Sequence, residues 1–166
     1  MTLLVPHRAL LVLILVGSTL ALARPPDAKL AIINESPSLP PGLYMRAFGA
    51  QPALGAIVAV SPPPSTRPYL QSLGLPSEVV LLKRVAASGG DLVCADGTTV
   101  TAGERVVIAR AYDRSGRSLP KWEGCAPLGP GEIFLLGDTA ASFDSRYFGP
   151  VSRETVVGVF AEVFTW

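Results

Sequence analysis

Hydrophobic residues along the chain are grouped into short runs that are rich in β-branched side chains and are bounded by turn-forming residues. Because such runs are typical of strands between tight turns, strands are predicted at residues 56–60, 79–85, 106–111, 133–136 and 156–164. The proline-rich segment 61–68 lacks most of the amide donors of a ladder and is predicted to be a loop. A short helix is expected after it, at about residues 68–72. The pattern therefore predicts a mainly β fold.

The longest uncharged apolar run lies near the N-terminus, at residues 9–23, and is preceded by Arg8. This run is short for a membrane-spanning helix and has the usual length of a signal-peptide core, and it ends in the A-x-A pattern Ala21-Leu22-Ala23. The sequence slightly favours cleavage over retention of residues 1–23 as one apolar transmembrane helix. In both cases residues 24–166 are expected to form a single exported domain.

Composition excludes some classes of partner. The 166-residue chain is 49% hydrophobic and has a formal net charge of +1. It therefore has neither the composition of a disordered protein nor the basic surface of a nucleic-acid-binding protein, and no DNA or RNA partner is expected. Its 16 Gly and 16 Pro are spread without a repeat, which agrees with short strands joined by many turns.

The two cysteines, Cys94 and Cys125, both lie in the domain that is expected to be exported. In an oxidising compartment they are expected to form one disulfide, and the alternative is two buried free thiols. A disulfide would staple residues 94–130, which are polar and rich in Gly and Pro at both ends, into a flap or subdomain. No metal site or cofactor is expected, because two cysteines without a downstream histidine are too few ligands for structural zinc.

Candidate chemistry in the exported domain is found by elimination. The only histidine, His7, precedes the apolar run, so a serine nucleophile in the domain cannot use a histidine base. A lysine is the remaining choice, and Lys29 and Lys121 both lie in ordinary polar surroundings. Lys83 differs from them because it interrupts the apolar run at residues 79–85.

Strand geometry places Lys83 on the same face as Leu81 and Val85. Burial of an ammonium group lowers its pKa, and a neutral lysine amine can act as a general base toward a hydroxyl. The alternative is that the Lys83 side chain reaches an edge of the sheet and pairs with a carboxylate in solvent.

A second polar cluster follows the strand predicted at residues 133–136. Asp138 comes directly after this strand, and Asp144 and Arg146 follow a turn of small residues. Asp144 and Arg146 are expected either to pair with one another or to brace the loop against the core, and a carboxylate or hydroxyl here is also suited to orient a lysine amine.

Three segments in this order resemble the signal peptidase I family of Ser/Lys proteases, and most closely its TraF branch from conjugative transfer systems. They are NESPSLPPGLY at residues 34–44, LLKRVAASGGD at residues 81–91 and GDTAASFDSRYFGPV at residues 137–151. The resemblance extends over about residues 34–164 and implies a twisted, signal-peptidase-like β-sheet domain.

Carried over by position, the resemblance makes Ser38 the nucleophile, Lys83 the general base and Asp144 the third catalytic residue. Ser36 matches a serine that contributes to the oxyanion hole together with the Ser38 N–H. This chain departs from common signal peptidases at Pro37, where they have glycine between the two serines.

The last segment supplies the supporting residues. Ser142 stands two residues before Asp144, where general signal peptidases have a serine that bonds the lysine amine. Arg146 is expected to be the structural partner of Asp144, and Asp138 is expected to support the same loop.

The function that the resemblance implies is that of a Ser/Lys endopeptidase at the inner membrane or in the periplasm, with its catalytic domain on the periplasmic side. Its expected partners are the membrane and a protein substrate, most simply the propilin of a conjugative type IV secretion system, which is either hydrolysed or cyclised. The alternatives are a general signal peptidase that acts on preproteins and a non-catalytic exported β-domain of a secretion apparatus. A self-cleaving repressor is disfavoured by the export segment.

Overall fold

The computed structural model describes residues 29–166. The predicted export segment at residues 1–23, with His7 and the apolar helix expected there, lies outside the described residues. Within residues 29–166, none of the helices is both long enough and apolar enough to cross a membrane.

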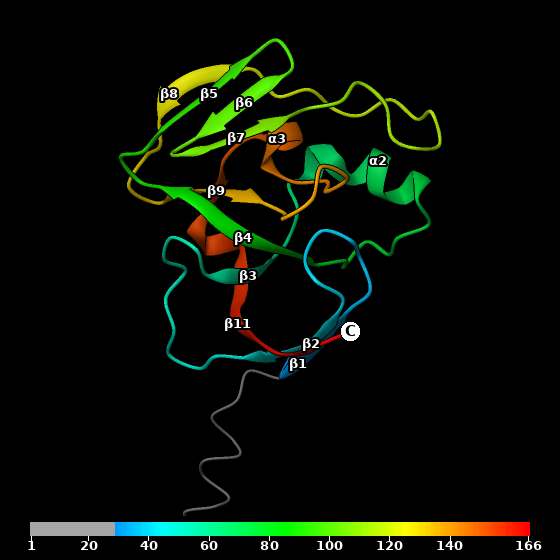
Figure 1. Ribbon diagram of the computed structural model, residues 1–166, viewed down its shortest axis with the longest axis vertical. Coiled ribbons are helices and arrows are strands. Elements are labelled where there is room, and N and C mark those ends of the chain that lie inside the picture. Colours follow the sequence, from blue (N-terminus) through cyan, green and yellow to red (C-terminus); the bar gives the residue numbers. More distant parts are fainter. Residues whose placement is uncertain (1–28) are drawn as a thin grey trace, which may run out of the picture.

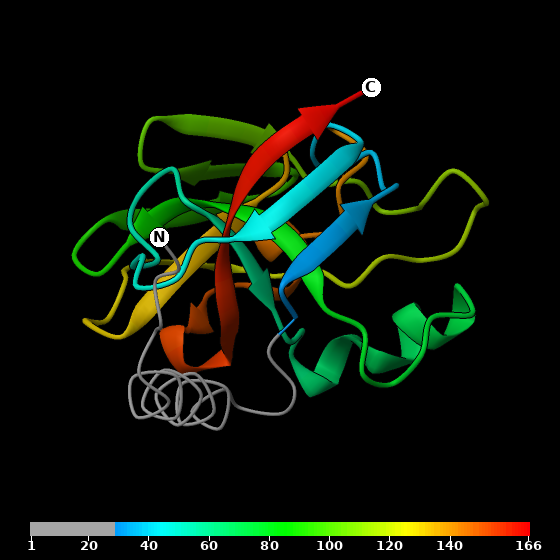
Figure 2. The same ribbon diagram turned by 90° about the horizontal axis from the view of Figure 1, so that it is seen from below.

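The larger of two sheets has seven strands, and all its neighbouring strands are antiparallel. Its spatial order is β1 (Ala31–Asn34), β2 (Gly42–Arg46), β11 (Val156–Thr165), β3 (Ile57–Val60), β4 (Leu81–Ser88), β9 (Glu132–Leu136) and β10 (Val151–Ser152). Figure 2 shows β1, β2 and β11 side by side at one end of the sheet. The register of β11 shifts between Glu162 and Phe164 and again between Val156 and Gly158, and such bulges increase the local twist of a strand. The long strand β11 can therefore pair with β2 at one end and with β3 at the other.

A second, four-stranded antiparallel sheet is inserted between β4 and β9. Its order is β7 (Arg105–Ile108), β6 (Thr99–Ala102), β5 (Leu92–Asp96) and β8 (Gly124–Pro127). Figure 1 shows this sheet stacked over β4 and β9. The disulfide expected between Cys94 and Cys125 is present and joins β5 to β8, so the flap predicted at residues 94–130 is a stapled sheet.

Helices are short and lie between strands. They are η1 (Pro64–Thr66), α2 (Arg67–Ser72), α3 (Ser145–Phe148) and η2 (Arg153–Thr155). The helix predicted at residues 68–72 corresponds to α2, which begins with Pro68 in its first turn, where the missing amide is tolerated. The loop predicted at residues 61–68 therefore contains one 3-10 turn and the start of α2.

Three clusters of buried side chains hold the sheets together. One fills the space between them, with Val93 and Val100 from the smaller sheet packed against Phe134 from the larger. The other two lie on opposite faces of the larger sheet, so that neighbouring residues of a strand, such as Val58 and Ala59, belong to different clusters. Lys83 shares its strand face with Val85 and is paired across the ladder with Val58.

The mainly β prediction is confirmed, with differences at the strand ends. The strand expected at residues 79–85 begins at Leu81 and continues through the small residues Ala86 and Ala87 to Ser88. The strand expected at residues 106–111 is β7, which spans Arg105–Ile108. The structure adds six short strands that the sequence pattern did not predict: β1, β2, β5, β6, β8 and β10. All four residues of β8 are exposed, so pairing with β5 rather than burial defines it.

Candidate active site

The loop between β1 and β2, residues 35–41, carries Ser36 and Ser38 and is organised by the side chain of Asn34. The buried Asn34 Nδ2 donates hydrogen bonds to the carbonyls of Ser36, Leu39 and Pro40 at 3.0, 3.0 and 3.1 Å. Its Oδ1 accepts from the backbone N–H and the hydroxyl of Ser36. A proline-rich loop forms few hydrogen bonds of its own, so Asn34 supplies the contacts that fix the shape of this one.

Ser38 lies in the middle of this loop and is buried, with 6% of its surface exposed. Its neighbour Leu39 is inserted in the core beside Tyr44. The Ser38 carbonyl accepts a hydrogen bond of 2.6 Å from the backbone N–H of Asp138, which ties the loop to the chain just beyond β9. Two segments that are 100 residues apart in the sequence thus meet at Ser38.

Ser36 stays on the exposed side of the loop. Its hydroxyl donates to Asn34 Oδ1 at 3.0 Å and accepts the Ser38 N–H at 3.4 Å. The two groups that the resemblance assigns to the oxyanion hole are therefore hydrogen-bonded within the loop, and the bond between them is long and weak.

Lys83 is almost fully buried, with 3% of its surface exposed, and does not reach an exposed edge of the sheet. Its Nζ donates to the carbonyl of Leu82 at 3.1 Å. Burial lowers the pKa of Lys83 from 10.5 to about 8, while the Asp144 charge opposes this shift and the Arg146 charge adds to it. An appreciable fraction of the amine is therefore neutral near physiological pH.

Asp144 and Arg146 form a buried bidentate ion pair, which was one of the two arrangements expected from the sequence. The Arg146 Nε and Nη2 donate to the two carboxylate oxygens at 2.7 and 2.9 Å. Arg146 also donates to the carbonyls of Ile108 at the end of β7 and of Thr139 in the preceding turn, each at 3.3 Å. The pair therefore connects α3, the turn after β9 and the smaller sheet.

Gly137 lies where Ser38, Ser142 and Asp144 approach one another. Its N–H donates to Asp144 Oδ2 at 2.8 Å. A Cβ atom at this position would overlap the Ser142 side chain and the Ser38 carbonyl oxygen. Arg84 of β4 is paired with Leu136, so Lys83 is next to the chain as it leaves β9 at Gly137. The absence of a side chain at Gly137 lets all these groups approach.

Ser142 and Asp138 flank this junction in different environments. The Ser142 Oγ is buried and has no hydrogen-bond partner within residues 29–166. The Asp138 carboxylate is half-buried and accepts two hydrogen bonds from Arg84, at 3.1 and 2.9 Å. Ser142 is thus available for a new hydrogen bond, whereas Asp138 anchors β4 to the segment after β9.

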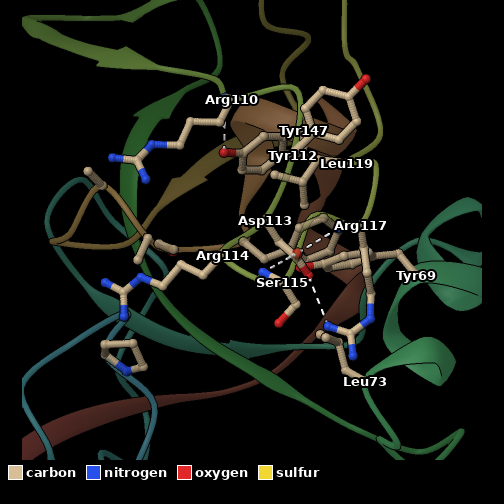
Figure 3. A pocket seen from close by; sticks show the side chains of 15 residues that line it. Tyr69, Leu73, Arg110, Tyr112, Asp113, Arg114, Ser115, Arg117, Leu119 and Tyr147 are labelled. Atoms are coloured by element: carbon tan, nitrogen blue, oxygen red, sulfur yellow. Dashed lines mark hydrogen bonds and ion pairs between the residues drawn. The ribbon is translucent and has the colours of Figure 1, made fainter.

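A cavity of about 220 Å³ adjoins the junction, and Pro37 and Ser142 form part of its lining. Figure 3 shows it between Tyr69 and Leu73 of the α2 region and the flap residues 110–119. The small residues Ala140 and Ala141 and the ring of Phe143 also line it. Besides these small and aromatic side chains the lining includes the charged Arg110, Asp113, Arg114 and Arg117. The cavity therefore suits a polypeptide segment that places a small side chain beside Pro37 and Ser142.

The flap wall of this cavity is held by the carboxylate of Asp113. This group accepts from the backbone amides of Ser115 and Arg117, both at 2.8 Å, and from the Arg117 side chain at 3.2 Å. These hydrogen bonds, led by the Arg117 backbone N–H, lower the pKa of Asp113. On the opposite side, the Tyr147 hydroxyl accepts the Arg110 N–H, as Figure 3 shows.

Two residues that sequence reasoning left without a role are central to this site. Asn34 begins the first motif, but its side chain was given no function there; a polar residue at the end of an apolar strand was the available signal. Gly137 ends the apolar run before the acidic segment, and its importance depends on contacts with Ser38 and Ser142 that only the folded chain makes.

Replacement of Asn34 by Asp is expected to lower the free energy of unfolding by about 2 kcal/mol or more, because the amide donors to three carbonyls are replaced by an acceptor. Denaturant titration measures this change. Glu35→Gln, at the adjacent exposed position, is the control and is expected to stay within about 0.5 kcal/mol of the wild type. Equal stability of the two variants would contradict the role of Asn34.

Replacement of Lys83 by Met is expected to stabilise the protein at pH 7 by up to about 3 kcal/mol, because the lysine is charged in both states there and its burial is costly. Between pH 8 and 10.5 the folded wild type loses this proton before the unfolded chain does. The wild type then gains stability with rising pH, and the gap between the two proteins closes. Denaturant titrations at several pH values measure the difference in free energy of unfolding between the two proteins, and Lys121→Met, at an exposed position, is the control. A difference that does not change with pH would disprove the lowered pKa of Lys83.

Comparison with known proteins shows which family the chain is similar to. The family model described as signal peptidase, peptidase S26, matches residues 4–166. The plasmid transfer protein TraF of Escherichia coli is 34% identical over 163 residues, which cover 90% of this chain and 92% of the relative. The conjugal transfer protein TraF of Agrobacterium fabrum is 33% identical, with coverage of 81% and 82%.

Signal peptidase I V of Bacillus subtilis is 30% identical over 99 residues, which cover 52% of this chain and 59% of the relative. The likeness to the TraF proteins is thus spread over a larger share of the chain than the likeness to this signal peptidase. The chain belongs to the signal peptidase S26 family, as a TraF-type member.

Proposed function

We propose that this protein is a Ser/Lys endopeptidase of conjugative transfer, in which Ser38 is the nucleophile and Lys83 the general base. The observation that carries the proposal is the burial of Lys83 beside the segment that docks the Ser38 loop, with a pKa lowered to about 8. A lysine with its ordinary pKa would be almost entirely protonated at neutral pH and could not accept a proton.

In the acylation step, the Ser38 Oγ attacks a substrate carbonyl while its proton passes to the neutral Lys83 Nζ. The peptide C–N bond then breaks, the lysine ammonium returns the proton to the leaving amine, and an ester to Ser38 remains. Water, activated by Lys83, hydrolyses this ester, or a substrate amine captures the acyl group and gives a cyclic product.

Asp144, Arg146 and Ser142 are proposed to support the Lys83 amine as it gains and loses a proton in these steps. Asp144 favours the ammonium form of Lys83 electrostatically, and Arg146 holds the Asp144 carboxylate in place through the buried ion pair. The Ser142 hydroxyl has no hydrogen-bond partner among residues 29–166 and lies close to Gly137, so it is suited to hydrogen-bond and orient the Lys83 amine. These are positioning roles, with the Ser38 and Lys83 side chains as the reacting groups.

The oxyanion would be held by the Ser38 N–H and the Ser36 hydroxyl, each contributing on the order of 3 kcal/mol. In the free protein the Ser38 N–H donates to Ser36 at 3.4 Å, a long contact that costs little to exchange for a substrate oxygen. The Ser36 hydroxyl must also turn away from Asn34 to donate. Pro37 restricts the backbone of Ser36 to extended conformations, while Pro37 and Ser38 themselves lie in a turn.

The proposed substrate is the propilin of a conjugative transfer system, processed at the periplasmic face of the inner membrane. Support comes from the relatives named as plasmid or conjugal transfer proteins, whose likeness covers most of the chain. The cavity beside Ser38, lined by Ala140 and Ala141, fits the small residues that signal peptidases accept before the cleaved bond.

Ser38→Ala and Lys83→Ala are each expected to reduce propilin processing by a factor of about 10⁴ or more, because each removes one of the two reacting groups. Mass spectrometry of the pilin product measures the loss and also distinguishes linear from cyclic pilin. Ser77→Ala and Lys121→Ala, at exposed positions, are matched controls that keep wild-type rates. Normal processing by either site variant would disprove the assignment, and faster processing of a secreted preprotein than of propilin would favour a general signal peptidase.

The pH dependence of kcat/KM is expected to follow the neutral form of Lys83. Below pH 8 the rate should rise about tenfold per pH unit, and above pH 8 it should level off, because the amine is then deprotonated. Cleavage of a fluorogenic peptide between pH 6 and 10 measures this profile. A midpoint near 10.5, the value of an exposed lysine, would show that Lys83 is not the base.

A further inference from the structure

A second cavity, of about 360 Å³, lies away from Ser38 and shares no lining residue with the cavity beside it. It is formed by Arg46 at the end of β2, residues 47–52 of the following loop, Arg153 of η2, and residues 156–159 at the start of β11. In Figure 1 this loop is the cyan segment that leads from β2 to β3. Arg46 and Arg153 are the charged residues of the lining, and both are positive.

Both arginines keep a buried nitrogen without a hydrogen-bond partner. Arg46 Nη2 donates to the Val157 carbonyl at 2.7 Å, but Arg46 Nη1 has no partner within residues 29–166. Arg153 Nε is likewise buried and unpartnered in the described chain. A buried guanidinium N–H without an acceptor is costly, and neither arginine has an ion-pair partner among the described residues. Two guanidinium groups therefore line one cavity without a counter-ion from residues 29–166.

The local backbone makes room for the Arg46 guanidinium. A Cβ at the buried Gly158 would lie 2.9 Å from Arg46 Cζ and 3.0 Å from Arg46 Nη1. Gly158 lies at the bulge of β11, so a residue without a side chain leaves the guanidinium flat against the strand. On its other side the guanidinium lies 5.8 Å from the centre of the Phe48 ring. Arg46 is thus held in a defined orientation, with one edge directed away from the Val157 carbonyl.

We propose that this cavity binds a phosphate group through Arg46 and Arg153. A phosphate offers several acceptor oxygens and negative charge, and guanidinium groups match its geometry better than any other side chain. Binding neutralises two positive charges that have no acidic neighbour in the lining. The inference does not depend on the peptidase mechanism, because none of these residues takes part in it.

The position of the cavity favours the phosphodiester of an anionic phospholipid as the source of the phosphate. The Arg46 backbone N–H donates to the carbonyl of Leu30 at 2.8 Å, so the cavity adjoins the chain shortly after the predicted export segment. Two apolar side chains here are exposed to solvent: Phe48, which lines the cavity, at 65%, and Leu30 at 42%. Exposed apolar groups beside a pair of arginines suit acyl chains and a headgroup at a bilayer surface.

Thermal unfolding of the full-length protein in a neutral detergent tests the proposal with four additives at matched ionic strength. They are inorganic phosphate, glycerophosphoglycerol, dihexanoyl-phosphatidylglycerol and dihexanoylglycerol, which has acyl chains but no phosphate. The lipid is expected to raise the Tm at the lowest concentration, the two soluble phosphates at higher concentrations, and dihexanoylglycerol not at all. If only the soluble phosphates raise the Tm, the phospholipid is ruled out as the source of the bound phosphate. If dihexanoylglycerol raises the Tm as much as the lipid does, recognition of phosphate is ruled out.

Variants of the two arginines complete the test. Arg46→Gln and Arg153→Gln are expected to weaken the response to phosphatidylglycerol about tenfold or more, since each removes a charged donor. Gly158→Ala keeps both charges but displaces the Arg46 guanidinium, so this variant is also expected to respond more weakly to phosphatidylglycerol. Arg67→Gln, an exposed arginine that lines a different cavity, is the control of equal charge and should respond like the wild type. An Arg153→Gln protein that folds and responds like the wild type would disprove the site, whatever the outcome for peptide cleavage.

Discussion

The buried ion pair between Asp144 and Arg146 is the interaction on which the site depends. It joins the turn after β9, α3 and the end of β7, because Arg146 also donates to Ile108 and Asp144 accepts from Gly137. Loss of one partner of such a pair leaves an uncompensated buried charge, which typically costs about 3–5 kcal/mol. The same two charges act in opposite directions on the pKa of Lys83, so the pair fixes both the geometry and the electrostatics around the amine.

The two serines of the first motif are positioned by contacts of a different kind. Asn34 holds three carbonyls of the loop, and the Asp138 N–H holds the carbonyl of Ser38. Ser38 is thereby held through its backbone carbonyl rather than through its hydroxyl. This arrangement explains how a loop with several prolines, which has few amides to donate, can still be rigid.

Apolar runs predicted buried strands of the larger sheet, such as β3, where every residue is buried, and they also predicted β7 at the edge of the smaller sheet. The strands that these runs missed are short and are defined by their partners. β8 is fully exposed, yet it pairs with β5 and carries one half of the disulfide. Hydrophobic patterning reports burial, and it is silent where a strand is held by backbone hydrogen bonds and a covalent link alone.

The sequence by itself determined the mainly β class, the unusual position of Lys83 on an apolar strand face and the order of the three motifs, because each of these depends on residue type and local spacing. Only the tertiary structure decided that Lys83 is buried rather than exposed at an edge, that Gly137 must lack a side chain, and that Arg46 and Arg153 line one cavity. These facts depend on contacts between segments far apart in the chain, and such contacts leave no periodic signal in the sequence.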